Sequence, residues 1–459
     1  MRRRERIRIG AGQGFWGDLL SAPVDQVRRG PLDYLVLDYL AEVTMSILQK
    51  QRARDPAQGF ARDFVPLMGE ILPDCVERDV RVVANAGGVN IEGCRDQVLG
   101  EARKAGLTGR VNVGVVTGDD VLARLPALIE AGHEMRNMDT GRPLTDVLDR
   151  VASANAYFGA RPVIEALERD ARVVITGRVT DPALTYAPMM HEFGWRFDQL
   201  DLLAAGAVAG HLNECGAQAS GGNSLVDWEG IDDLEVIGFP IIEANADGTF
   251  VITRHESSGG HVSRAGVTEQ LVYELGDPAR YITPDVIADF RSIRLEEDGP
   301  DRVRVSGIRG SAPPEQIKLS ISYRDGYKAV GTLVYGWPDA VKKAREADRI
   351  LRARFDRMGL RLERIRTEFV GWNATHGALA GPPPPDLPEV QLRIAVASHD
   401  RTSVEKFTRE VAPLVLTGPP TVTGYAGGRP RMQEIIAYWP ALIDRDQIEP
   451  YLKVEVTTA

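Results

Sequence analysis

The chain has 459 residues, with 55 Lys and Arg against 65 Asp and Glu, so its formal net charge is −10. An acidic chain is a poor match for a nucleic-acid binder, which needs a basic face to neutralise phosphates. The length predicts two or three domains. Three cysteines without metal-ligand spacing, and the lack of an apolar stretch long enough to cross a bilayer, predict a cytoplasmic protein that does not bind membranes.

The first 225 residues alternate short β-branched segments with segments of helical spacing, which predicts an α/β lobe with a mostly parallel open sheet. The expected strands are 6–10, 34–38, 80–85, 111–117 and 171–176. Each ends in a small or polar residue. Such residues would line a ligand crevice at the carboxyl edge of the sheet, or they would only cap helices and form turns.

The next segment, residues 226–380, has the pattern of an α+β lobe with hairpins. Asp-Gly pairs between alternating segments predict turns at 247–248, 298–299 and 325–326, and an amphipathic helix is expected over about 338–358. A proline-rich strap follows. Beyond it, residues 389–459 predict a βαβ-like segment packed on one of the lobes, with a helix over about 403–416 and a glycine-rich loop over 423–431.

A glycine-rich segment, residues 10–18, follows the first expected strand. Its three glycines Gly12, Gly14 and Gly17 have the GxGxxG spacing of a dinucleotide-binding turn. Asp38 lies where a ribose-binding acid would be expected, but Phe15 and Trp16 put large rings where a pyrophosphate needs bare backbone. The segment therefore predicts either a nicotinamide site or an aromatic-lined turn of another pocket, in which Trp16 lines an apolar slot.

Acidic and amide side chains gather at the next strand ends. Asp38 and Glu42 lie four residues apart, so on a helix they would share one face and could serve as acid and base; the alternative is helix capping and a solvated acid. The turn from Asn85 to Asn90 would bind a substrate carbonyl, or is a turn stabilised by asparagines. Arg178 would bind a ligand carboxylate or phosphate, or would pair with Asp181.

The densest polar segment is 210–223. On a helix, His211, Glu214 and Cys215 would share one face and bring together a base, an acid and a thiol. A zinc site, a cysteine nucleophile with His211 as its base, and a buried unreactive cysteine are the alternatives. The exit of the segment, which would bind an anion through backbone amides, consists of Gly221, Gly222 and Asn223.

Two histidines, His255 and His261, lie in a loop that leads into an expected helix. A helix amino terminus favours anions, so this loop would bind a phosphate. Alternatively, His261 would act as a general base. A capped helix with exposed histidines is the remaining interpretation.

These segments resemble the acyclic terpene utilisation AtuA family. The similar strings are GQGFWGD (12–18), LDYLVLDYLAEVTMSIL (32–48), VVANAGGVN (82–90), VITGRVTDPAL (174–184), HEFGW (191–195) and AGHLNECGAQASGGN (209–223). The similarity runs from about Ile7 to the end of the chain and corresponds to the main domain of the family. Many members carry a further ferredoxin-like domain after this point, which we do not expect in this chain.

The resemblance implies a cytoplasmic catabolic enzyme that acts on a branched or hydroxylated acyl-CoA or a related carboxylic acid. It supplies no set of catalytic residues. We expect acid–base chemistry of the hydratase, lyase or thioester hydrolase type, with a CoA thioester as substrate and no cofactor demanded by the sequence. Alternatives are an NAD(P)-dependent dehydrogenase built on the Gly12 segment, and a non-catalytic partner subunit of an acyl-CoA carboxylase or lyase; either form could be a homo-oligomer.

Overall fold

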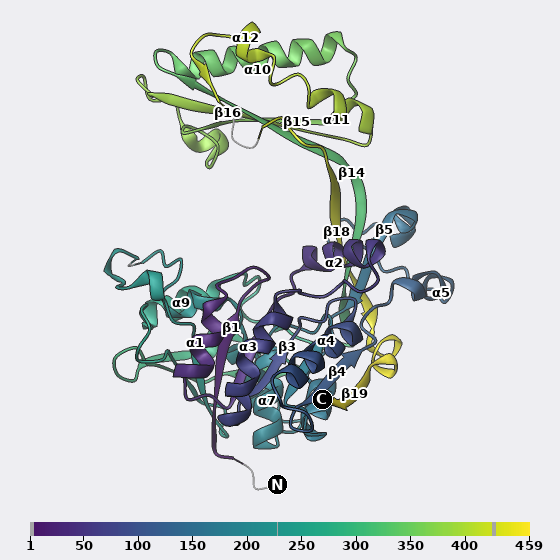
Figure 1. The fold of residues 1–459 in the computed structure, drawn as a ribbon, viewed down its shortest axis with the longest axis vertical. Helices are drawn as coiled ribbons and strands as arrows, with labels where there is room; N and C mark the ends of the chain where they lie inside the picture. Colours follow the sequence, from purple (N-terminus) through teal and green to yellow (C-terminus); the bar gives the residue numbers. More distant parts are fainter. Residues whose placement is uncertain (1–3, 227, 425–427) are drawn as a thin grey trace. The chain divides into compact units, whose positions relative to one another are not determined.

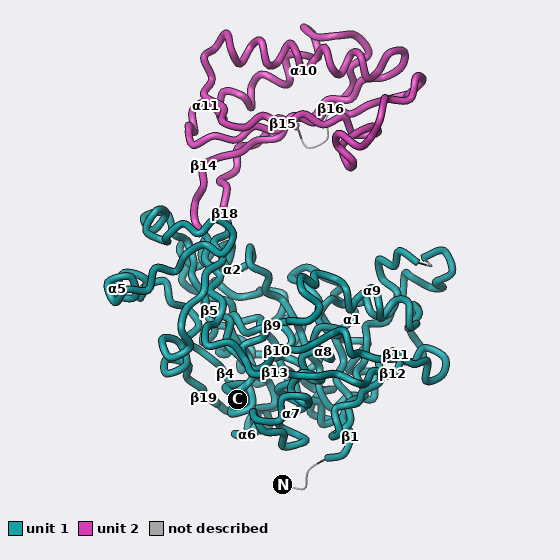
Figure 2. The backbone as a smooth tube through the Cα atoms, turned by 180° about the vertical axis from the view of Figure 1, so that it is seen from behind, with its two compact units in different colours: residues 1–322, 438–459 teal, residues 323–437 magenta. Residues whose placement is uncertain are grey.

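The computed structural model describes residues 4–226, 228–424 and 428–459, and the chain divides into two compact units (Figure 2). Unit 1 consists of residues 1–322 and 438–459, and unit 2 of residues 323–437. Both boundaries fall inside long strands, β14 (Gln316–Gly336) and β18 (Gln433–Asp444). The units therefore divide the chain at other positions than the boundaries expected near residues 225 and 380.

Unit 1 is built on a ten-stranded sheet with a parallel centre (Figure 1). In sheet order the central strands are β1 (Arg6–Gln13), β2 (Tyr34–Leu37), β3 (Arg81–Ala84), β6 (Val173–Thr176) and β4 (Asn112–Thr117). All four pairings among them are parallel. The five strands expected from the sequence and the α/β class are thus confirmed, and the carboxyl ends of the five strands lie along one edge of the sheet.

Antiparallel strands extend this sheet on both sides. Beside β1 lie β7 (Ile241–Asn245), β8 (Phe250–Thr253), β12 (Val303–Ser306) and β11 (Arg294–Glu297), and beside β4 lies β19 (Lys453–Thr458). The hairpins expected at 247–248 and 298–299 are confirmed. They join the N-terminal sheet rather than forming a lobe of their own, because β7 pairs with the edge strand β1 and satisfies its backbone groups.

Four short strands complete unit 1. They are β5 (Val151–Ala156), which pairs with β14, and the small sheet of β9 (Tyr281–Ile282), β10 (Ile287–Asp289) and β13 (Arg309–Ser311).

Helices cover both faces of the central sheet (Figure 1). They are α1 (Ser21–Arg29), α3 (Phe64–Glu77), α4 (Ile91–Lys104), α6 (Arg161–Glu168), α7 (Ala183–Phe193) and α8 (Leu200–Glu214). Unit 1 also contains α2 (Glu42–Arg54), which packs on β5, as well as α5 (Leu125–Glu130) and α9 (Arg264–Val272). One core lies around α6, α7 and α8, and a second lies around α1, α3 and α4. In the described part of the chain, no helix is long and apolar enough to cross a membrane.

Unit 2 is an antiparallel sheet covered by helices. Its elements are β14, β15 (Arg364–Val370), β16 (Glu389–Ser398), β17 (Val422–Thr423), α10 (Ala340–Arg357), α11 (Arg401–Phe407) and α12 (Leu414–Thr417). The helix expected over 338–358 is confirmed as α10, whose apolar stripe includes Leu351 and Phe355.

Two expectations for this region are wrong. The hairpin predicted at 325–326 does not form, because β14 runs through that position as one strand and Gly326 absorbs the irregularity with a φ of 88°. The single helix expected over 403–416 is broken into α11 and α12 by a turn that leads to Pro413. The glycine-rich loop expected over 423–431 includes residues 425–427, which lie outside the described residues.

Candidate functional site

The carboxyl ends of β2 and β3 bring Asp38 and Asn85 together. The two strands are parallel neighbours, so the residues that follow them meet at one edge. The Asn85 side-chain amide donates to Oδ1 of Asp38 at 2.5 Å and accepts from the backbone N–H of Tyr39 at 2.6 Å. Both side chains are buried. Asn85 thus fixes one oxygen of Asp38 and leaves the other for a proton or a ligand.

Arg178 follows β6 and is buried, with a side chain that is 1 % exposed. Its Nη1 and Nη2 donate to the two oxygens of Asp181 at 2.7 and 3.2 Å, and Nη1 also donates to the carbonyl of Leu40. Pairing with Asp181 is thus the interpretation that the structure supports. The guanidinium holds the loop after β2 in place, and does so from inside the protein rather than as an open anion clamp.

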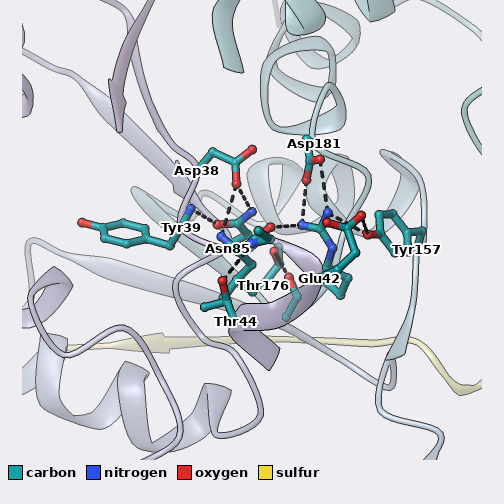
Figure 3. Close-up of polar contacts among 12 residues, drawn as sticks. Asp38, Tyr39, Glu42, Thr44, Asn85, Tyr157, Thr176 and Asp181 are labelled. Carbon is teal, nitrogen blue, oxygen red and sulfur yellow. Dashed lines mark hydrogen bonds and ion pairs between the residues drawn. The ribbon is translucent and has the colours of Figure 1, made fainter. Parts of the chain in front are cut away.

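Glu42 lies at the first turn of α2 and is half-buried. The phenol of Tyr157 accepts from Nη2 of Arg178 at 3.0 Å and donates to Oε1 of Glu42 at 2.7 Å. The ammonium of Lys318 lies 3.5 Å from the same carboxylate oxygen. Figure 3 shows Glu42 beside Tyr157, with Asp38 and Asp181 in the same cluster. Three elements besides α2 therefore hold this carboxylate.

The surroundings of Asp38 and Glu42 push their pKa values apart. Burial raises the pKa of Asp38 well above its ordinary value, and the nearby charge of Asp181 raises it further. Burial also acts on Glu42, but Arg178 and the Tyr157 hydrogen bond outweigh it and lower the pKa of Glu42 to about 2. The pKa of Asp38 therefore lies well above that of Glu42, so Asp38 keeps its proton over a pH range in which Glu42 is already ionised, which is the condition for an acid and a base at one site.

The spacing suggested that the two carboxyls share a helix face, but the structure does not place them on one. Asp38 lies before α2, which begins at Glu42 itself, with Ala41 as the extended residue that precedes it. Arg178 contributes to the pKa of both groups, so the charge that links them comes from the end of β6 rather than from helical spacing.

His211 and Glu214 form a buried pair near the carboxyl end of α8. Nε2 of His211 lies 2.9 Å from the carbonyl oxygen of Gln270, which can only accept, so Nε2 carries a hydrogen. Nδ1 lies 3.1 Å from Oε1 of Glu214. A hydrogen bond there needs one proton between the ring and the carboxyl. Burial lowers the pKa of His211, but Glu214 outweighs it and raises the pKa.

This pair lies within electrostatic reach of the first cluster, because Glu214 raises the pKa of Asp38 and Asp181 raises that of Glu214. Cys215 is different. Both ring nitrogens of His211 are engaged elsewhere, and burial with the charge of Glu214 raises the pKa of the thiol, which opposes a thiolate nucleophile. Among the described residues, no group of three or more His, Cys, Asp or Glu side chains is arranged to hold a metal ion.

The comparison with protein families settles what the chain is related to. The model of the acyclic terpene utilisation family protein AtuA matches residues 7–454. The chain belongs to the AtuA family. Membership connects it with the use of acyclic terpenes, a catabolic process. No curated protein matches the chain.

The glycine segment of this AtuA-family chain differs from a dinucleotide-binding turn. Strand β1 extends to Gln13, so Gly12 lies within the strand. A Cβ at Gly14 would lie 2.5 Å from the backbone nitrogen of Gly216, so protein backbone fills the space that a pyrophosphate would need. Trp16 packs against the α3 side of the core and donates to Asp63 at 2.5 Å.

Other expected site residues have structural partners. Asn90 caps α4 and donates to the carbonyl of Gln58 at 2.9 Å. The amides of Gly221 and Gly222 donate to carbonyls of their own turn, so they are occupied there, and Asn223 continues that turn with a φ of 57°. His261 is exposed, with Nδ1 3.0 Å from Asp301, and lies beside the 220–223 turn rather than the Asp38 cluster.

Three residues of the site were not expected from the sequence. Tyr157 follows β5, whose Ala-, Ser- and Asn-rich sequence has little strand signal. Lys318 comes from β14, far along the chain; its one signal is that lysine is scarce beside arginine. Asp119 follows β4 and accepts from the backbone N–H of Arg178 at 2.8 Å and from Asn155 at 3.0 Å. Burial raises the pKa of Asp119 to about 6.

Proposed function

We propose that the chain is a cytoplasmic enzyme that acts on a branched or hydroxylated acyl-CoA or related carboxylic acid by acid–base chemistry of the hydratase or lyase type. The observation that carries the proposal is the opposite shift of the Asp38 and Glu42 pKa values at the carboxyl edge of one sheet. Ligands of open α/β sheets bind at that edge, and family membership supplies the catabolic context.

The proposed step uses Glu42 as the base and Asp38 as the acid. The Glu42 carboxylate takes a proton from the carbon next to the substrate carbonyl. The electron pair forms the double bond, and the hydroxyl on the next carbon leaves as water with the proton of Asp38. Hydration runs the same step in reverse. Proton transfers of this kind contribute about 10²- to 10⁴-fold to turnover.

The neighbouring groups have supporting roles in this proposal. Lys318, whose side chain is 39 % exposed beside Glu42, would attract the substrate carbonyl oxygen and stabilise the charge that develops on it. Arg178 and Tyr157 keep Glu42 ionised and oriented. The His211–Glu214 pair, which holds a proton near Asp38, would return a proton to Asp38 after each turnover.

The test is turnover of a panel of branched 2-enoyl- and 3-hydroxyacyl-CoA thioesters, followed by absorbance of the conjugated thioester. Glu42→Gln should lower turnover at least a hundredfold. Glu92→Gln is the matched control, because Glu92 is also the acidic residue in the first turn of a helix, α4; it should change turnover less than twofold. Equal losses in the two variants would contradict the proposal. Wild-type protein that turns over no thioester, alone or with NAD(P), would favour a non-catalytic partner subunit.

A further inference from the structure

A cavity of about 670 Å³ lies in unit 1 away from the Asp38 cluster. We call it the arginine cavity, because the cationic and histidine side chains that line it are Arg8, Arg29, Arg254, Arg302 and His255. On β1, Arg8 lies five residues before Gln13, whose carbonyl accepts from the backbone N–H of Asp38 at 3.1 Å. Five residues span about 16 Å along a strand at ~3.3 Å per residue. None of the acid–base residues described above lines this cavity.

Strand register explains why arginines collect there. Arg8 pairs with Glu243 of β7, Glu243 pairs with Val251 of β8, and Val251 pairs with Arg304 of β12. Residues in register project to one face, so this row crosses the sheet on the face opposite to α8. On the row's face, α1 packs on β1 and ends at Arg29 beside the cavity.

Guanidiniums outnumber carboxylates around Glu243, at the cavity end of the row. The carboxylate of Glu243, 3 % exposed, receives three guanidiniums, from Arg6, Arg8 and Arg302, the last two at 2.9 and 2.7 Å. Asp298, in the turn between β11 and β12, pairs with Arg302 and Arg304, and the exposed Glu296 of β11 lies in register with Arg304 at the far end of the row. Three guanidiniums therefore share the one buried carboxylate of Glu243. Burial and the like charges of Arg8 and Arg302 lower the pKa of Arg6, as expected where cations crowd.

The rest of the lining is close to neutral. Arg254 pairs with Asp301 at 2.7 Å, and Arg29 lies 3.3 Å from Asp25. Glu256 is exposed and is the remaining acid of the cavity. His255 is buried, and burial lowers its pKa, with Arg29 and Arg254 acting in the same direction against Asp25. A neutral imidazole can therefore donate or accept beside the arginines. The lining therefore has one surplus positive charge, four arginines against Glu243, Glu256 and Asp301, in a chain whose net charge is −10.

We propose that the arginine cavity binds the phosphate groups of a phosphoester of nucleotide size. A phosphate carries up to two negative charges and three acceptor oxygens, which match several guanidiniums held in fixed positions by one buried carboxylate. The volume is in the range of small-molecule sites and far exceeds that of inorganic phosphate. Each guanidinium has five donors, of which Glu243 takes one or two, so donors remain for the ligand.

The source of the phosphoester is either the nucleotide end of a thioester substrate or a separate nucleotide. The first source rests on the proposed function, and the second does not. Both predict the same arginine contacts.

Isothermal titration of the full chain with adenosine 3′,5′-bisphosphate, ADP and pyrophosphate tests the proposal without any turnover. We expect binding that weakens with added salt. Arg8→Gln and Arg302→Gln should each weaken it about tenfold or more, and each leaves two guanidiniums on Glu243, so the fold should tolerate the change. Arg304→Gln is the matched control: it removes the same charge from the same row but does not line the cavity, and should change the dissociation constant less than threefold.

Absence of binding by all three ligands would overturn the proposal, as would equal losses in Arg302→Gln and Arg304→Gln. If the nucleotide that binds also competes with an acyl-CoA substrate, the cavity holds the substrate's own nucleotide end. If it binds without competing, the ligand is a separate nucleotide. Loss of the proposed acid–base function would leave the titration unaffected, so the two proposals fail independently.

Discussion

Replacing Arg178 by Met removes the cation on which the candidate site is built. The side chain is 1 % exposed and donates to Asp181 twice, to Leu40 and to Tyr157. Removing one partner of a buried ion pair costs about 3–5 kcal/mol, because the remaining charge stays buried without compensation. Since the side chain of Asp181 is 31 % exposed, water compensates part of its charge. We therefore expect a loss of unfolding free energy at the lower end of this range, about 3 kcal/mol.

The assay is chemical denaturation followed by the fluorescence of the unit 1 tryptophans, with a double-mutant cycle. Arg178→Met combined with Asp181→Asn should be more stable than Arg178→Met alone, because the second change removes the uncompensated charge. Arg172→Met is the control: that guanidinium pairs with an Asp79 side chain that is 75 % exposed, and surface pairs contribute about 0–1 kcal/mol. A cost below about 1 kcal/mol for Arg178→Met, or strict additivity with Asp181→Asn, would refute the reasoning.

Three further predictions concern the surroundings of this cluster. Gly14→Ala should destabilise the protein by about 1–3 kcal/mol, because its Cβ meets the backbone of Gly216 at 2.5 Å; a melting temperature equal to that of Gly100→Ala, whose Cβ meets nothing within 4 Å, would contradict this. Cys215→Ser should retain turnover within about twofold, since the raised pKa keeps the thiol protonated; a hundredfold loss would restore the nucleophile hypothesis. Turnover should fall as pH rises through the raised pKa of Asp38, because the acid must be protonated. It should not fall on the acidic side until about pH 2, because Glu42 stays ionised above that pH. A rise in turnover with pH would reverse the two roles.

The sequence was sufficient for those parts of the site that depend on local pattern. Asp38, Asn85 and Arg178 follow strands with clear β-branched signals, and parallel strands must end at a common edge. Their approach could therefore be predicted, and the pairing of Arg178 with Asp181 was one of the two alternatives that the sequence offered. Likewise the two confirmed hairpins have Asp-Gly turns at the predicted positions.

Features that depend on long-range pairing could not be predicted. Tyr157 and Lys318 meet Glu42 only because β5 pairs with β14, a contact between segments about 160 residues apart. Long-range pairing also explains why the boundaries between the two units could not be predicted. Nothing in the local sequence pattern of β7 indicates that it pairs with β1. At 325–326 the Asp-Gly pair was a true local irregularity, but the flanking residues continue as one strand because the β16 partner extends past Gly331 to Tyr327.

The central claim is that Asp38 keeps its proton over a pH range in which Glu42, in the same site, is already ionised. Infrared difference spectra of the wild type against Asp38→Asn and Glu42→Gln, recorded as a function of pH, measure this directly. We predict a protonated-carboxyl band that persists well above pH 3.8 and disappears in Asp38→Asn, and a carboxylate band that disappears in Glu42→Gln and persists to about pH 2. An Asp38 carboxyl that titrates at its ordinary pKa near 3.8 would contradict the account.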